Sequence, residues 1–211
     1  MTSRKLSRWY PAVGKRFLDV IVGSMLLMIT LPIQGVVAIV VLCDVGAPIL
    51  FKQPRPGRHG YVFTVLKFRS MRVEAMLPEC SNADEERLTA AGRLLRATSL
   101  DELPQLINVV RGDMSLIGPR PLLVEYLPLY SMEQAKRHMV RPGLTGWAQV
   151  NGRNAVTWAE RLRQDSWYAE NVSLSLDMRI LWRTLWTVIS RRGVSGDAMS
   201  TMSKFDGSSG D

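Results

Sequence analysis

Residues 20–43 read VIVGSMLLMITLPIQGVVAIVVLC, and these 24 residues include no charged side chain. As an α-helix the stretch would be about 36 Å long, which is enough to cross the hydrocarbon core of a bilayer. It is also longer than the apolar core of a cleavable signal peptide. The sequence therefore predicts a membrane-embedded helix near the N-terminus.

The middle and the flanks of this stretch bear on its topology. Pro32 lies in the middle, and a proline removes a backbone hydrogen bond and bends a helix. Basic residues flank the stretch on both sides: Arg4, Lys5, Arg8, Lys15 and Arg16 before it, and Lys52, Arg55 and Arg58 after it. A spanning helix is expected to have a basic flank at its cytoplasmic end only. We expect residues 1–46 to form a basic N-terminus and a re-entrant helix that breaks at Pro32; a kinked transmembrane helix is the alternative.

The chain as a whole is basic. Its 211 residues include 27 Lys and Arg against 19 Asp and Glu, and the sequence pI is about 9.9. Such a surface suits nucleic acid, an anionic membrane or a phosphorylated substrate. The two cysteines, Cys43 and Cys80, are far apart, and the two histidines, His59 and His138, are isolated. These spacings argue against a disulfide scaffold and against a zinc site.

The remaining patterns predict a mainly α domain with a short β-hairpin. Residues 48–53 and 61–71 are rich in β-branched and aromatic residues and flank the turn-forming PRPGRHG, which is typical of a hairpin. Lys67 and Arg69 alternate with Phe68, which would put both cations on one face of a strand. Helical patterns cover residues 83–97, 103–110, 121–130, 157–170 and 174–191. We expect a small cytosolic globular domain over residues 47–197 and a C-terminal tail over residues 198–211.

The last helical pattern is apolar over most of its circumference. It contains Trp182 and Trp186 one turn apart, with Arg179 and Arg183 among them. Amphipathic helices of this composition can lie in a membrane interface. A core helix with exposed arginines is the alternative interpretation.

The stretch TSLDELPQL, residues 98–106, places Asp101 and Glu102 side by side in this basic chain. One interpretation is a capping box, in which Ser99 and Glu102 satisfy free backbone N–H groups at a helix start. Pro104 agrees with a helix start, where its missing N–H costs nothing. The other interpretation is chemical, with the two carboxylates acting on a phosphorylated substrate.

Several arginines lie in turns that are rich in proline and glycine: Arg120 in GPRP, Arg141 in VRPGLTG and Arg153 in NGRN. The planar donor fork of arginine suits phosphate oxygens better than the point charge of lysine does. Arg96 closely precedes the acidic pair. If the Asp101 carboxylate attacked a phosphorus, the two anions would repel by about 4 kcal/mol at a separation of about 4 Å and an effective dielectric of about 20. A divalent cation and arginines would offset this repulsion.

A set of motifs occurs in order between residues 15 and 207: KRFLDVIVGSMLL, KQPRPG, KFRSMR, TSLDELPQLINVVRGDMSLIGPRPLLVEYLPLY, RPGLTGWAQVNGRN and the closing GVS and KF. Together they resemble the small monotopic phosphoglycosyl transferases, a bacterial sugar transferase family. The PglC type, undecaprenyl phosphate N,N'-diacetylbacillosamine 1-phosphate transferase, is the most similar. The resemblance implies transfer of a sugar-1-phosphate from a UDP-sugar to undecaprenyl phosphate, with release of UMP and a requirement for Mg²⁺.

The resemblance also implies a setting for this reaction. The protein would lie in the bacterial inner membrane as a monotopic protein, with its catalytic domain on the cytoplasmic face. It would perform the first membrane step of glycoconjugate assembly, such as protein glycosylation, with downstream membrane glycosyltransferases as partners. The similarity to the PglC type favours an N-acetylated amino sugar such as di-N-acetylbacillosamine.

The resemblance assigns the catalytic dyad to Asp101 and Glu102. Asp101 would be the nucleophile, forming a phosphosugar–aspartyl intermediate, and would also be a magnesium ligand, while Glu102 would support it. The expected substrate-binding residues are Lys67, Arg96, Arg120, Arg141 and Arg153. The family breaks its re-entrant helix at a Ser–Pro step, whereas Leu31 precedes Pro32 in this chain.

Two other classes of function remain open. The first is a non-enzymatic basic membrane anchor that recruits RNA or an acidic partner. We expect no nucleic acid, because binding it would favour aromatic residues interleaved with basic ones, whereas most tryptophans here lie within residues 147–186. The second is a hydrolase of a lipid-linked diphosphate, which would release product without an acceptor lipid.

Overall fold

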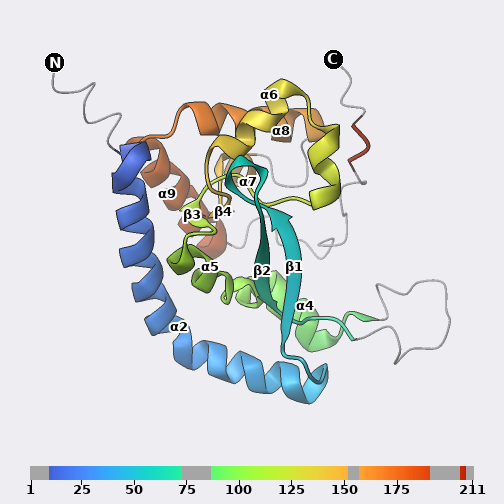
Figure 1. Cartoon of the computed structure of the whole chain (residues 1–211). Helices are drawn as coiled ribbons and strands as arrows, with labels where there is room; N and C mark the ends of the chain where they lie inside the picture. Colours follow the sequence, from blue (N-terminus) through green and yellow to red (C-terminus); the bar gives the residue numbers. More distant parts are fainter. Residues whose placement is uncertain (1–9, 73–86, 152–156, 191–204, 208–211) are drawn as a thin grey trace.

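The computed structural model describes residues 10–72, 87–151, 157–190 and 205–207. This part of the chain is mainly helical and contains two two-stranded sheets. Figure 1 shows the long N-terminal helix α2 passing along one side of the globular part and then beneath it. The mainly α domain with a hairpin is therefore confirmed within these residues.

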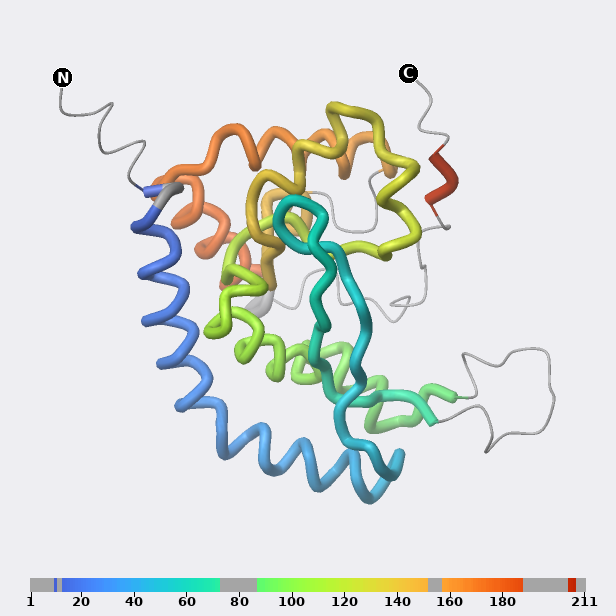
Figure 2. Tube along the Cα trace, in the orientation of Figure 1, coloured from blue at the N-terminus to red at the C-terminus, as the bar shows by residue number. Residues whose placement is uncertain are grey.

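Helix α2 (Lys15–Asp44) follows a short π-helical turn, η1 (Tyr10–Gly14). It is the one helix among the described residues that is long and apolar enough to cross a membrane. Pro32 lies inside the helix, and the helix continues through it. Figures 1 and 2 show a sharp bend near the middle of α2. The expected break thus takes the form of a bend within a continuous helix.

Two polar side chains accompany the bend. Thr30 Oγ1 donates a hydrogen bond to the Leu26 carbonyl oxygen (2.7 Å), and Gln34 Nε2 donates to Thr30 Oγ1 (3.0 Å). A hydroxyl that bonds to the carbonyl four residues earlier tends to bend a helix. Gln34 is also buried, although most side chains of α2 are not. Thr30 therefore supplies, two residues before Pro32, a backbone hydrogen bond of the kind that Leu31 cannot make.

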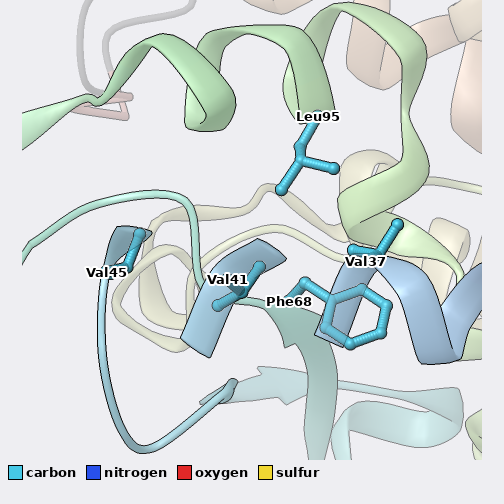
Figure 3. Close-up of a cluster of buried hydrophobic side chains, with 5 residues drawn as sticks. All are labelled: Val37, Val41, Val45, Phe68 and Leu95. Carbon is cyan, nitrogen blue, oxygen red and sulfur yellow. The ribbon is translucent and has the colours of Figure 1, made fainter. Parts of the chain in front are cut away.

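Both halves of α2 pack on the same globular domain. In the first half, a Cβ added to Gly23 would lie 3.0 Å from Val109 Cγ1, so α2 and α5 (Gln105–Arg111) approach closely there. In the second half, one buried cluster joins α2 to the domain, as Figure 3 shows: Val37, Val41, Val45, Phe68 and Leu95. Large apolar side chains along α2 remain exposed: Phe17, Met28, Ile29, Val36 and Ile39.

The predicted hairpin is present. Strands β1 (Leu50–Pro56) and β2 (Val62–Phe68) are antiparallel, with Leu50 opposite Phe68, and the turn between them contains η2 (Arg58–Gly60). Strand β1 runs further than predicted because prolines are tolerated where a two-stranded sheet leaves an edge unpaired. Arg69 lies beyond the end of β2, and its guanidinium donates to the Ala47 carbonyl (3.2 Å).

The helical predictions succeed in part. Helices α8 (Trp158–Glu170) and α9 (Leu174–Ser190) are confirmed, and α5 starts two residues later than predicted. Helix α4 (Ala90–Thr98) covers the second half of its predicted range, of which residues 83–86 lie outside the described residues. The prediction of a helix over residues 121–130 is wrong in type, because that segment forms a 3₁₀ helix, η5 (Val124–Leu129), with Pro128 inside it.

The remaining elements are short. They are η4 (Leu100–Glu102), β3 (Ser115–Ile117), α6 (Met132–Ala135), η6 (Lys136–Met139), β4 (Gly143–Thr145) and α7 (Trp147–Asn151). Strands β3 and β4 pair in parallel. This pair was not predicted, because three residues are too few to show an alternating pattern.

A buried carboxylate ties the start of α2 to the C-terminal helices. Asp177 in α9 is fully buried and accepts hydrogen bonds from Tyr10 Oη (2.6 Å), Lys15 Nζ (2.6 Å) and Tyr168 Oη (2.7 Å). Helix α9 buries Leu176 and Ile180 and exposes a second apolar face: Leu174, Met178, Leu181, Trp182, Leu185 and Trp186. The helix therefore packs into the core on one side, and the described residues leave its aromatic face uncovered on the other.

One residue of the expected C-terminal tail is part of the core. Phe205 is buried against Tyr126, Tyr130 and Trp158, with ring centroids 5.5–5.7 Å apart. The backbone N–H of Phe205 donates to Tyr126 Oη (3.3 Å). The tail thus returns to the domain at Phe205.

Candidate active site

The two adjacent carboxylates lie in a single turn between two helices. Helix α4 ends at Thr98, Ser99 adopts a left-handed conformation (φ 57°), and η4 carries Asp101 and Glu102. A positive φ is uncommon outside glycine, and it reverses the chain direction after α4. The capping-box interpretation is wrong: the Ser99 side chain makes no cap hydrogen bond, and Glu102 binds cationic side chains instead.

Glu102 is held by two cations. Its Oε1 accepts hydrogen bonds from Lys67 Nζ (2.7 Å) and from Arg120 Nη2 (2.5 Å). Burial alone would raise the pKa of Glu102, but the charges and hydrogen bonds of Arg120 and Lys67 outweigh burial and lower this pKa to about 2. Glu102 is therefore ionised at neutral pH, and its position is fixed.

Asp101 has a different environment. The residue is only 8% exposed, and its carboxylate makes no hydrogen bond or ion pair with any residue that the structure describes. Burial and the charge of Glu102 raise the pKa of Asp101, against the opposing charges of Lys67, Arg96 and Arg120. A buried carboxylate without a donor is costly unless a ligand completes it. Of the two carboxylates, Asp101 is therefore the one that remains available to bind a ligand.

Three of the five expected substrate-binding residues lie around this pair. Lys67 comes from β2 and Arg120 from the turn after β3, and both contact Glu102. Arg96 lies in the last turn of α4, where its Nε donates to Ser70 Oγ (2.9 Å), and its charge acts on Asp101. The sequence interval between these cations exceeds fifty residues, so the fold assembles them.

The backbone of Arg120 is fixed from two sides. On one side, the Gly118 N–H donates to the Thr145 carbonyl (2.8 Å) and the Gly143 N–H donates to the Pro119 carbonyl (2.9 Å). A Cβ at Gly118 would lie 2.4 Å from the Arg141 carbonyl oxygen, so only glycine fits. Proline before and after Arg120 restricts the backbone further.

On the other side, Arg137 holds the Arg120 carbonyl. Arg137 lies in η6, is only 2% exposed, and donates from Nη2 to both the Arg120 carbonyl oxygen (2.7 Å) and Asp165 Oδ2 (2.7 Å). Sequence reasoning missed Arg137 and Asp165, since a basic run such as KRH resembles a solvated surface. Their burial is visible only once α8 packs on η6.

The fourth expected residue, Arg141, is not brought to the pair. Arg141 Nε donates to the Gly112 carbonyl oxygen (2.8 Å), beyond the C-terminal end of α5, whereas the pair precedes the N-terminal end of this helix. The charged neighbours of Arg141 are Arg16, Arg58 and Asp19. Arg153 lies outside the described residues.

The donors present are compatible with a magnesium ion. Among the described residues no group of three or more His, Cys, Asp or Glu side chains could hold a metal by itself. Mg²⁺ is commonly bound through one or two carboxylates together with water and substrate phosphates. The free carboxylate of Asp101 fits such a site, whereas Lys67 and Arg120 already occupy Glu102. The arrangement as a whole can present the carboxylate of Asp101 as a nucleophile to a phosphorus that is surrounded by cationic side chains.

Comparisons with known proteins identify the family of the chain. A family model described as "Bacterial sugar transferase" matches residues 10–191. The chain is 48% identical over 194 residues to "Uncharacterized sugar transferase EpsL" of Bacillus subtilis, with 92% of this chain and 96% of that protein covered.

Two relatives have names that state a reaction. "Undecaprenyl-phosphate galactose phosphotransferase" of Salmonella typhimurium is 40% identical over 196 residues, which cover 85% of this chain and 41% of that protein. "UDP-glucose:undecaprenyl-phosphate glucose-1-phosphate transferase" of Caulobacter vibrioides is 40% identical over 186 residues, which cover 83% of this chain and 70% of that protein. The chain thus spans less than half of the Salmonella relative.

Proposed function

Because the chain belongs to the bacterial sugar transferase family, we propose that it transfers a sugar-1-phosphate from a UDP-sugar to undecaprenyl phosphate and releases UMP. The observation that carries this proposal is the contrast within the acidic pair. Asp101 is buried without a partner among the described residues, while Glu102 beside it is bound by Lys67 and Arg120. The names of the Salmonella and Caulobacter relatives supply the two substrates.

The transfer proceeds in two displacements. A carboxylate oxygen of Asp101 attacks the sugar-linked phosphorus of the UDP-sugar, and the bond from this phosphorus to the bridging oxygen breaks. UMP leaves with that oxygen, and a phosphosugar–aspartyl intermediate remains. A phosphate oxygen of undecaprenyl phosphate then attacks the same phosphorus and releases the Asp101 carboxylate.

The cationic residues favour both displacements. Lys67, Arg96 and Arg120 stabilise the charge that develops on the phosphate oxygens, and Glu102 keeps Lys67 and Arg120 in place. A magnesium ion held by Asp101 and the diphosphate would neutralise the leaving group. Arg153 is proposed as a further phosphate ligand on the strength of its NGRN turn alone.

We place the protein in the bacterial inner membrane with α2 as a re-entrant helix. Both halves of α2 pack on one globular domain, through Gly23 and through the cluster of Val37 and Val41. A domain that lies on one side of a bilayer can contact both halves only if both ends of the helix emerge on that side. The exposed apolar residues of α2 and the aromatic face of α9 then contact lipid, with the domain on the cytoplasmic face.

The identity of the sugar is the finer part of the proposal. The resemblance to the PglC type favours an N-acetylated amino sugar such as di-N-acetylbacillosamine. The comparisons give no support to an amino sugar, since the relatives named above act on galactose and glucose. The panel of donors should therefore contain UDP-galactose, UDP-glucose, UDP-N-acetylglucosamine and UDP-di-N-acetylbacillosamine. The lipid-linked product is a substrate for a membrane glycosyltransferase in glycoconjugate assembly.

UMP release by the purified full-length protein tests the function. We expect multiple turnovers only when a UDP-sugar and undecaprenyl phosphate are both present. No release with any donor of the panel would favour the non-enzymatic anchor. Continuous UMP release without the acceptor lipid would indicate hydrolysis of the UDP-sugar, whereas a hydrolase of a lipid-linked diphosphate would release no UMP.

A further inference from the structure

Two arginines that do not contact the acidic pair use only one of their guanidinium nitrogens within the described residues. Arg58 uses only Nε, which donates to the Met139 carbonyl oxygen (3.2 Å), and Arg141 uses only Nε, which donates to the Gly112 carbonyl oxygen (2.8 Å). The Nη groups of both residues make no hydrogen bond or ion pair with the part of the chain that is described. Each guanidinium is thus oriented by backbone while its two terminal nitrogens stay available.

A third arginine lies beside them. Arg16 donates from Nη1 to the Val109 carbonyl (2.6 Å) and from Nη2 to the Val110 carbonyl (2.8 Å). Its Nη2 lies 3.1 Å from where a Cβ on Gly112 would be, so Arg16 and Arg141 both lie against Gly112. The end of α5 does not need Arg141 as a cap, because Arg16 already occupies two of its last carbonyls.

Among the described residues, none of the three arginines makes an ion pair with a carboxylate. Burial and the neighbouring charges of Arg16 and Arg58 lower the pKa of Arg141. The nearby Asp19 accepts hydrogen bonds from Ser115 Oγ (3.0 Å) and the Leu116 N–H (3.0 Å), and from no arginine of the group. Like charges held together in this way are relieved by an anion between them.

The place of the group in the fold separates it from the acidic pair. The pair lies just before the N-terminal end of α5, whereas Arg16 and Arg141 donate to carbonyls at its C-terminal end, and a helix of 7 residues spans about 10 Å. Arg16 lies in the first turn of α2, directly before the exposed apolar Phe17. On the membrane placement proposed above, this is the level at which lipid headgroups meet the protein.

We propose that Arg16, Arg58 and Arg141 form a binding site for the phosphate of an anionic phospholipid headgroup. Arg58 and Arg141 donate to the phosphate oxygens through their open forks, and Arg16 adds its charge from behind. Arg141 then has a phosphate-binding role, but away from the reacting phosphorus. This inference rests on the membrane location within the proposed function.

Native mass spectrometry of the full-length protein in mild detergent tests the site. Phosphatidylglycerol is the probe, and the zwitterionic phosphatidylcholine, whose headgroup has no net charge, is the comparison. We expect the double variant Arg58→Gln/Arg141→Gln to retain phosphatidylglycerol about tenfold less well than the wild type, given the strength of charge-assisted hydrogen bonds. The matched control is Arg111→Gln, which removes one charge from the exposed last residue of α5 and should retain the lipid normally.

A single substitution covers the case in which the double variant fails to fold. Arg141→Lys keeps the charge and loses the fork, so its phosphatidylglycerol retention should fall while Arg111→Gln stays at the wild-type level. Equal retention by the wild type and Arg141→Lys would overturn the proposal. Displacement of the bound lipid by lower concentrations of undecaprenyl phosphate or inorganic phosphate would also overturn it, because the site would then serve another phosphate. UMP release by the same wild-type sample tests the proposed function separately.

Discussion

Arg120 reaches both carboxylate oxygens of Glu102, with Nη2 2.5 Å from Oε1 and Nη1 3.4 Å from Oε2. This contact makes Glu102 a fixed anion that faces two cations, while Asp101 is left without a donor among the described residues. Adjacent acids in one short turn therefore have unequal tasks. Glu102 organises the cations, and Asp101 is available for reaction.

The difference between the environments of Asp101 and Glu102 predicts how the rate of UMP release depends on pH. Activity requires ionised Asp101, so the rate should fall as the pH drops through the pKa of Asp101, which burial and Glu102 raise above its usual value. Glu102→Gln removes the repelling anion and leaves the charges of Lys67 and Arg120 unneutralised. The pKa of Asp101 should then fall, and the acid limb of the residual UMP-release activity should move to lower pH.

The matched control for this shift is Glu125→Gln, which removes a carboxylate of η5 that is not among the charges acting on Asp101. Its acid limb should coincide with that of the wild type. An acid limb that stays in place in Glu102→Gln would show that another group sets it.

The fork of Arg120 predicts a strict requirement for arginine. Arg120→Lys keeps the positive charge, but a lysine at this position can contact only one oxygen of Glu102. The positions of Glu102 and of Lys67, which binds it, are then no longer fixed. We expect kcat/KM for UMP release to fall by about tenfold to a hundredfold, which corresponds to roughly 1.4–2.7 kcal/mol of transition-state stabilisation. Circular dichroism should show an unchanged fold. Activity within twofold of the wild type would assign Arg120 a structural role in its turn.

Arg137 is predicted to act through Arg120. Arg137→Lys keeps a charge beside Asp165 but cannot also hold the Arg120 carbonyl in the same geometry. We expect kcat to fall more than KM rises, because Arg120 is displaced from the transition state. Arg137→Ala should instead destabilise the protein by about 3–5 kcal/mol, since it leaves a buried Asp165 unpaired.

The neighbouring Lys136 offers a control for Arg137. Lys136 makes ion pairs with Glu133 (2.6 Å) and Glu170 (2.9 Å) at the surface. Such pairs contribute little, so Lys136→Gln should leave both kcat and the melting temperature near wild type. Equal losses of kcat in the Lys136 and Arg137 variants would point to a general effect on η6.

The bend of α2 predicts an effect on topology. Thr30→Val together with Gln34→Leu removes the polar pair at the bend, and Pro32→Ala restores the missing N–H. Each change should straighten the helix and increase the fraction that spans the membrane. A cysteine at position 5, with Cys43 and Cys80 replaced by serine, should be protected from an impermeant maleimide in intact cells. The same cysteine should become labelled in the two bend variants.

Labelling of position 5 in the otherwise unchanged helix would contradict the re-entrant topology. The control is Met25→Leu, an apolar exchange on the exposed face of α2 away from Pro32. It should leave position 5 protected.

Elements with strong local signals could be predicted from the sequence. The alternation and turn residues of the hairpin, and the helical period of α8 and α9, identify these elements correctly. The segment 121–130 has a helical pattern, yet Pro128 and its flanking geometry favour a 3₁₀ helix. Strands β3 and β4 depend on each other across the chain, and their three residues leave no local pattern.

The site was predictable in identity and less so in arrangement. The motifs point to Asp101, Glu102, Lys67 and Arg120, and the fold brings these residues together. Which acid is held and which is free depends on contacts from β2 and from the turn after β3, which sequence spacing cannot show. The side chain of Arg141 goes to Gly112 instead of the pair because its Nε finds a free carbonyl at the end of α5.

The last prediction concerns the nucleophile. If Asp101 attacks the phosphorus, then the enzyme with UDP-sugar and no lipid should release at most one equivalent of UMP and gain the mass of one phosphosugar, as intact-protein mass spectrometry can measure. Asp101→Asn keeps the size of the side chain but lacks the attacking anion, so it should form no adduct and turn over only at background. Glu102→Gln should still form the adduct, more slowly, because Glu102 only organises Lys67 and Arg120. An adduct in Asp101→Asn, or turnover by the wild type through a ternary complex without any adduct, would exclude the aspartyl intermediate.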